Sequence, residues 1–320
     1  MLKRLLLPLC FVSGLSCAAD PGADGLAYSP AVVGISNAGD LKGVRKVAVA
    51  SFVVQYVVKQ TEDLVVDFEP PLTADPAFLQ RLTEKMYGDF QASVKAAGLE
   101  LVPHATVVAT PEYKAMQGVS SPSPLLMDGW KLGSKTGAYK SLFYAPKDLV
   151  INLKDDYEEL RKSYGGFSSY VVDETLTFTG RIGQYATNWK FYDKDLQKAV
   201  GASTLHVRVF VPIAYLWSSQ SKAGGWTHYS AGAMAAVRLG ERFTRLAVGK
   251  DGDVVKIYLT EPVMTRGVTD ARLIKESTNF LGKVSRDVDY TLNVDGYQRV
   301  VPAATDATLK AFLDKMKENL

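Results

Sequence analysis

The sequence predicts an α/β fold of the α+β type: a mixed sheet that starts with a β-α-β unit, helices packed on it, and long antiparallel hairpins in the carboxyl-terminal half. Three observations predict this architecture. A valine-rich strand covers residues 46–58, an apolar stripe at helical spacing follows over 78–94, and extended runs separated by turn signals fill the chain after residue 204.

Residues 46–58 are the element around which the fold is expected to form. Successive residues of a strand lie on opposite faces of the sheet, and here both alternating sets are largely apolar. A strand with two apolar faces is typical of a central position with layers on both sides. We therefore interpret this strand as core and not as a site.

A helix is expected directly after this strand. Asp75 is a favourable N-cap, Pro76 suits the first helical position, and Gly98 is a natural end. An apolar residue recurs at every fourth position: Phe78, Leu82, Met86, Phe90 and Val94. Residues 99–103 then return as a strand, which completes the β-α-β unit.

Shorter elements are expected between this unit and the carboxyl-terminal half. They are a short strand at 31–34, a short helix beginning at Pro111, a long exposed loop over 118–140, a strand at 148–153, an acidic helix at 155–162 and a short helix at 193–200. The loop is equally consistent with a functional segment and with an insertion.

The carboxyl-terminal half is rich in expected strands. Residues 205–217 and 226–239 form two long extended runs joined by a loop at 218–225. A second hairpin is expected over 241–263, because Asp251-Gly252 is a strong turn signal. The chain ends with an amphipathic helix over 305–316.

The amino terminus has the pattern of a secretory signal peptide, residues 1–19. Lys3 and Arg4 precede a short apolar run, and small residues precede a cut after Ala19. Cys17 is an alternative site, as the lipidated cysteine of a lipoprotein, although Gly14 stands where such signals usually have leucine. Residues 20–43 are then a loosely held leader, and 44–320 one large α/β domain, with a subdivision near 118–147 left open.

Cysteine content and charge exclude several classes of function. Both cysteines, Cys10 and Cys17, lie in the signal segment, so the exported chain would have no disulfide and no cysteine-ligated metal. Loss of Lys3 and Arg4 lowers the net charge from +3 to +1. A charge this close to zero gives no reason to expect nucleic acid as a partner.

The sequence shows no catalytic motif, and we expect neither a cofactor nor a metal. His104, His206 and His228 form no metal-binding spacing, although His206 and His228 lie on neighbouring expected strands. Asp251 and Asp253 suit an ordered turn better than a calcium site. Four carboxylates share the acidic helix at 155–162, where they are expected to face solvent.

Aromatic residues gather around the expected long hairpin, and we take them as candidate partner contacts: Tyr215, Trp217, Trp226 and Tyr229. Such residues at a hairpin tip can cover the edge of a core, bind a partner protein or lie at a membrane interface.

The order of elements over residues 44–117 resembles a known arrangement. Val47-Ala-Val-Ala-Ser-Phe52 matches a Val-Ala-Val-x-x-Phe strand that precedes the helix in the periplasmic α/β domain of the curli secretion channel lipoprotein and in the amino-terminal domain of TolB-type proteins. This resemblance implies a non-catalytic role in envelope assembly or secretion. Unlike TolB-type proteins, the chain carries no propeller repeats after the domain.

These observations predict a non-catalytic, exported cell-envelope protein, periplasmic or outer-membrane associated, that acts in protein–protein interaction, assembly or secretion. One alternative is an outer-membrane pore or membrane-inserting protein that uses the 204–239 hairpin, whose strands reach the roughly 9–11 residues needed to cross a bilayer. Another is a secreted hydrolase that uses His206 or His228. The sequence leaves open the identity of envelope partners, membrane association and homo-oligomer formation.

Overall fold

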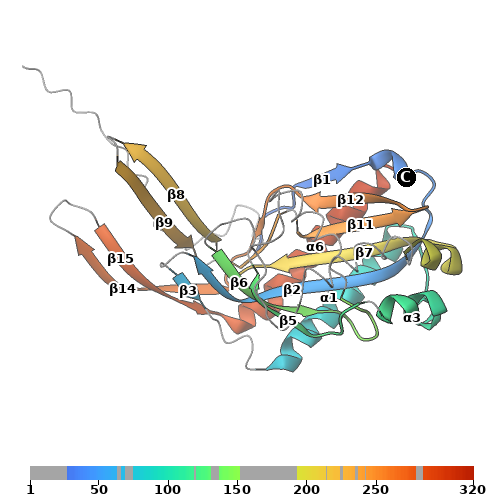
Figure 1. Cartoon of the computed structure of the whole chain (residues 1–320), viewed down its shortest axis with the longest axis horizontal. Coiled ribbons are helices and arrows are strands. Elements are labelled where there is room, and N and C mark those ends of the chain that lie inside the picture. Colours follow the sequence, from blue (N-terminus) through green and yellow to red (C-terminus); the bar gives the residue numbers. More distant parts are fainter. Residues whose placement is uncertain are drawn as a thin grey trace, which may run out of the picture.

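The computed structural model describes residues 27–62, 66–68, 75–118, 120–130, 137–151, 193–213, 215–223, 226–234, 237–241, 243–278 and 284–320. It confirms the α+β class: a large mixed sheet carries helices on one face, and two hairpins project from it (Figure 1).

Among the residues given above, nine strands form the main sheet. Seven of them run in the order β1 (Val33–Ser36), β12 (Asp253–Leu259), β11 (Arg245–Lys250), β7 (Ser203–Val211), β2 (Lys46–Glu62), β6 (Gly137–Tyr144) and β5 (Leu125–Trp130). The short strands β3 (Val66–Phe68) and β4 (Glu100–Leu101) also pair with β2. β2 runs parallel to β7 and β4 and antiparallel to β6 and β3, so it is the strand on which the others assemble.

The predicted central strand is confirmed, and both of its faces are buried. Phe52 and Tyr56 face one layer, whereas Val53 and Gln55 occupy the opposite face, and none of the four is more than 1% exposed. On that opposite face Arg208 donates a 2.6 Å hydrogen bond to Gln55, whose amide donates to Ser141 at 2.9 Å. These bonds link β7, β2 and β6 through side chains as well as through the backbone.

Two long helices cover the other face: α1 (Pro76–Ala96) and α6 (Val294–Lys317). Asp75 accepts a hydrogen bond from the backbone N–H of Ala77, as its N-cap role predicts. Phe52 packs against Tyr87 and Phe90 of α1, with ring centroids 5.4 and 5.8 Å apart. The hydroxyls of Tyr56 and Thr83 are hydrogen-bonded at 3.0 Å, which satisfies a polar group inside this core.

Shorter helices occupy the periphery: η1 (Ala38–Leu41), α2 (His104–Ala109), α3 (Pro111–Gly118) and helix 193–200. Helices α3 and 193–200, the strand near 31–34 and the 241–263 hairpin agree with the sequence predictions. Among the described residues, no helix combines the length and the apolar character needed to cross a membrane.

Four sequence predictions are wrong. The expected loop at 118–140 contains β5 and part of β6, because pairing next to β2 outweighs a composition rich in Gly, Ser and Pro. Residues 148–151 form no strand; Asp148 has a φ of 67° and Ile151 makes only an isolated bridge to Ser121. The last helix begins at Val294, where Asn293 caps it, and continues across Pro302.

The fourth error concerns the long run at 205–217. The structure divides it into β7, which ends at Val211, and β8 (Tyr215–Ala223), which belongs to a separate sheet. Pro212 follows directly after β7, and a proline has no N–H with which to continue a ladder. The expected loop at 218–225 is therefore mostly strand.

The substitution Phe52→Ala tests the packing of β2 on α1. We expect it to lower the free energy of unfolding by about 3–5 kcal/mol, because it removes a fully buried ring. Val32→Ala, at a side chain that is 46% exposed, is the control and should change stability by less than about 0.5 kcal/mol. Urea unfolding measures both; equal losses would contradict the packing described here.

Candidate functional site

The most distinctive feature of the molecule is a pair of β-hairpins outside the main sheet. One consists of β8 and β9 (Trp226–Met234), the other of β14 (Thr269–Thr278) and β15 (Val284–Leu292). Within the described residues, the strands of each hairpin pair only with each other. Both hairpins extend beyond the same end of the main sheet (Figure 1).

A small two-stranded sheet ties the roots of the two hairpins together. β10 (Arg238–Leu239), which follows β9, pairs with β13 (Val263–Met264), which precedes β14. Thr265 also donates its backbone N–H to the carbonyl of Val237. The β10 segment is held to the body as well, since Gly240 donates to the carbonyl of Phe210 at 2.8 Å. The two hairpins therefore leave the body from neighbouring points.

The β8–β9 register places the four candidate aromatic residues along the hairpin, not together at its tip. Trp226 pairs with Ala223 at the tip, whereas Tyr215 and Trp217 pair with Met234 and Gly232 near the root. Tyr229, opposite Gln220, occupies a position of the other face. The expectation that all four lie at the tip is wrong, because residues 218–223 are strand and only Trp226 belongs to the last pair of the ladder.

This placement puts aromatic residues at both ends of one face. From Tyr215 to the pair formed by Ala223 and Trp226 is eight residues along β8, a span of roughly 26 Å. The positions between them on that face hold small or uncharged residues: Ser219, Ser221, His228 and Ser230.

The β14–β15 hairpin was not predicted, and its register shows which apolar and which charged residues pair across the two strands. One face carries Ala271 opposite Tyr290 and Leu273 opposite Val288. Residues of opposite charge are register partners at three positions: Arg272 and Asp289, Lys275 and Asp287, and Glu276 and Arg286. The first two pairs belong to the other face, whereas Arg286 alternates with Val288 and Tyr290. The alternating Val288, Tyr290 and Leu292 was the sequence signal that could have identified this strand.

A second polar arrangement lies in the body, around Asp193. Its carboxylate accepts hydrogen bonds from Thr204 at 2.9 Å, from Gln197 at 2.8 Å and from His206 Nε2 at 2.9 Å. Burial by itself raises the pKa of Asp193, but the charge of His206 and these hydrogen bonds outweigh burial, so its pKa lies below the ordinary value. The cluster fastens helix 193–200 to β7.

The other histidines lie apart from this cluster. His206 is in β7, whereas His228 is in β9 opposite Ser221, so the expected approach of the two strands is wrong. His104 Nδ1 is hydrogen-bonded to the Tyr87 hydroxyl at 2.9 Å, between α2 and α1. No cluster of metal-ligating side chains occurs among the residues that the structure describes.

Asp251 and Gly252 form the β11–β12 turn with φ angles of 52° and 94°. Two successive positive φ angles are typical of a type I′ hairpin turn, as the sequence predicts. The candidate lipidation site Cys17 and the acidic helix at 155–162 lie outside the described residues.

No family model matches this sequence, and neither the curated proteins nor the solved structures contain a match to it. The resemblance over residues 44–117 is therefore an expectation from sequence alone.

Gly249→Ala tests whether the Asp193 cluster is tightly packed. A Cβ at Gly249 would lie 2.4 Å from both Asp193 Oδ2 and Thr204 Oγ1. We expect a loss of about 1–3 kcal/mol in the free energy of unfolding. Gly88→Ala, where a Cβ meets nothing within 4 Å, is the control and should stabilise α1 by about 0.5–1 kcal/mol. A neutral Gly249→Ala would show that the cluster is loose.

Asp193→Asn tests the ionised state of the same cluster. Because the folded-state pKa of Asp193 is lowered, its charge stabilises the fold above its ordinary pKa of about 3.9, and this stabilisation is lost as the pH falls through the lowered value. We expect the variant to be less stable by about 1–3 kcal/mol at pH 7. That difference should shrink in unfolding measurements below about pH 4, and a difference independent of pH would contradict the assignment.

Proposed function

We propose that this chain is a non-catalytic, exported cell-envelope protein whose α/β body positions two hairpins for insertion into a membrane, as one component of a larger assembly. The observation that carries the proposal is the pair of projecting hairpins with neighbouring roots. The signal-peptide pattern of residues 1–19 supports export.

Hairpin length supports a membrane role. The strands have nine residues in β8, β9 and β15 and ten in β14, close to the roughly 9–11 residues of a tilted transmembrane strand. The roughly 26 Å from Tyr215 to the pair formed by Ala223 and Trp226 is also close to the height of about 25 Å of the band that membrane strands cross. Tyr and Trp favour the two membrane–water interfaces because their rings are apolar and carry a polar group.

Within the part of the chain that the structure describes, the outer edges of both hairpins have no strand partner, and this supports assembly. A two-stranded hairpin is only marginally stable in water, and its outer edges offer unsatisfied N–H and C=O groups. Inside a bilayer every such group needs a partner. The hairpins therefore require further strands, and strands of further copies of this chain are the simplest source.

A second candidate uses the same hairpins without a membrane, to bind an envelope protein by strand addition. The three opposite-charge pairs of β14–β15 favour it, because charged positions on both faces of a hairpin suit water or a polar partner better than lipid. In this case also the hairpins, and not a catalytic centre, perform the function.

A cysteine scan of β8 tests membrane insertion. Residues 20–320 contain no cysteine, so single cysteines at positions 216 to 222 can carry an environment-sensitive dye without background. On addition of phospholipid vesicles, we expect dye emission to shift to the blue with a period of two residues, since alternate strand positions meet lipid and water.

Lys114→Cys, at an exposed position of α3, is the matched control and should show no shift. Uniform emission along the whole of β8, unchanged by vesicles, would exclude insertion of this hairpin and favour the partner-binding alternative.

A further inference from the structure

A cationic pocket lies at the opposite end of the sheet from the hairpins. It has a volume of about 380 Å³ and is lined by the segment before β2, by helix 193–200 with the residues that follow it, and by the β11–β12 turn. In Figure 1 helix 193–200 lies at the far right and the hairpins at the far left.

Five basic side chains and one carboxylate, Asp251, line this pocket. The basic residues are Arg45, Lys46, Lys194, Lys198 and Lys250. The excess of four positive charges exceeds the formal net charge of the whole chain, which is +3. An excess of positive charge in a concave site raises the local concentration of anions.

Neutralisation of these cations within the protein is incomplete. Lys46 pairs with Glu100 at 3.1 Å and Lys198 with Asp195 at 3.9 Å, and Lys250 donates to the carbonyl of Lys42 at 2.6 Å. Neither Arg45 nor Lys194 makes an ion pair with any residue in the described part of the chain. Both side chains are exposed and available to a ligand.

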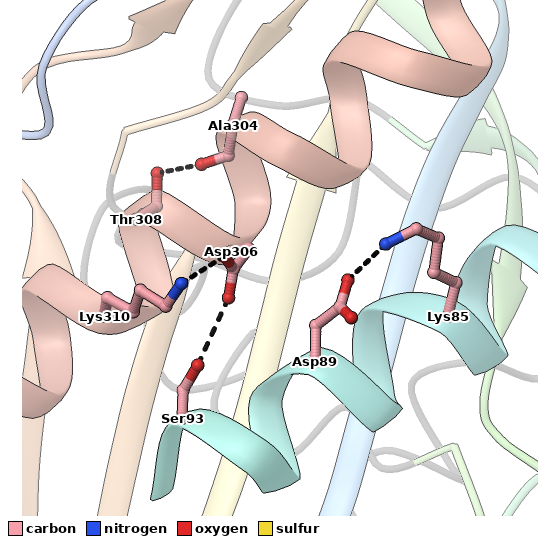
Figure 2. A network of polar contacts seen from close by, with 7 residues as sticks. All are labelled: Lys85, Asp89, Ser93, Ala304, Asp306, Thr308 and Lys310. Atoms are coloured by element: carbon pink, nitrogen blue, oxygen red, sulfur yellow. Dashed lines mark hydrogen bonds and ion pairs between the residues drawn. The ribbon is translucent and has the colours of Figure 1, made fainter. Parts of the chain in front are cut away.

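A groove between α1 and α6 differs from the cationic pocket in how far its charges are paired. Five charged residues line it, and four of them form two ion pairs: Lys85 pairs with Asp89 at 2.6 Å, and Asp306 with Lys310 at 2.6 Å (Figure 2). The fifth, Arg299, leaves an excess of one positive charge. Asp306 also accepts from Ser93 at 3.2 Å. That groove is a helix–helix contact with an excess of one charge in its lining, whereas the lining of the pocket beside Arg45 has an excess of four.

The lining of the cationic pocket suits phosphate groups. A guanidinium such as that of Arg45 offers a planar pair of donors to phosphate oxygens, and the lysines supply point charges. Gly43 and Gly201 both line the pocket, and a Cβ at either would meet nothing within 4 Å, so the backbone there is open to a ligand. The volume lies within the range of small-molecule sites and exceeds what a single phosphate needs.

We propose that this pocket binds a small soluble anion that carries two or more phosphate groups. A phospholipid headgroup offers the same chemistry, but the pocket and the hairpins lie at opposite ends of the molecule. The inference goes beyond the proposed function and does not depend on it.

Calorimetric titration of the full chain with inorganic pyrophosphate, at low ionic strength, tests this proposal. We expect saturable binding that weakens with added salt, because the contacts are between exposed charges. The double substitution Arg45→Gln with Lys194→Gln should weaken binding at least about 10-fold. Its thermal unfolding should match that of the wild type, since both side chains are exposed.

Lys114→Gln, an exposed lysine on α3, is the matched control and should leave the affinity within about twofold. Absence of saturable pyrophosphate binding, or equal binding by the double variant, would overturn the proposal. A second arm uses phosphatidylglycerol vesicles: vesicle binding that is lost in the double variant, without pyrophosphate binding, would assign the pocket to a lipid headgroup and overturn the soluble ligand.

Discussion

The burial of β2 on both faces is the constraint on which the rest of the structure depends. A strand whose two faces are both apolar is stable only when both faces are covered, and its buried backbone N–H and C=O groups need a strand on each edge. α1 supplies the layer against Phe52 and Tyr56, and β7 and β6 supply the edges. The buried bonds from Arg208 to Gln55 and from Gln55 to Ser141 hold those three strands in one register, because an unmatched polar group inside this core would be costly.

Bonds to the main sheet and to β13 also fix the points at which the β8–β9 and β14–β15 hairpins begin. Pro212 ends β7, and the chain that returns as β10 is bound both to Phe210 and to β13. β15 leads directly into α6, where Asn293 caps the helix and donates its N–H to the carbonyl of Val268. Two hairpins far apart in the sequence are thus anchored at one end of the body, while the cationic pocket lies at the other end.

The sequence predicted the parts of the fold whose signals are local. Asp75 and Pro76 mark the start of α1, and Asp251-Gly252 marks the turn between β11 and β12. The apolar residues on both faces of β2 mark a core strand. β5 depends instead on its place in the sheet beside β6 and β2, which composition does not reveal. The break after Val211 had a local signal, Pro212, that the prediction of one long strand did not use. The aromatic residues of β8–β9 were identified, but their spread along the hairpin required the register. The β14–β15 hairpin was missed because its many charges conceal an apolar alternation, and the Asp193 cluster because its members meet only in the fold.

Hydrogen–deuterium exchange of the full chain, with and without phospholipid vesicles, tests most directly the claim that a rigid body displays two hairpins in need of partners. The account predicts slow exchange for β2 and β7 in both conditions. It predicts fast exchange for β8–β9 and β14–β15 in water and strong protection of both hairpins on vesicles. Hairpin amides that are already as protected in water as those of β2, or that remain unprotected on vesicles, would contradict it.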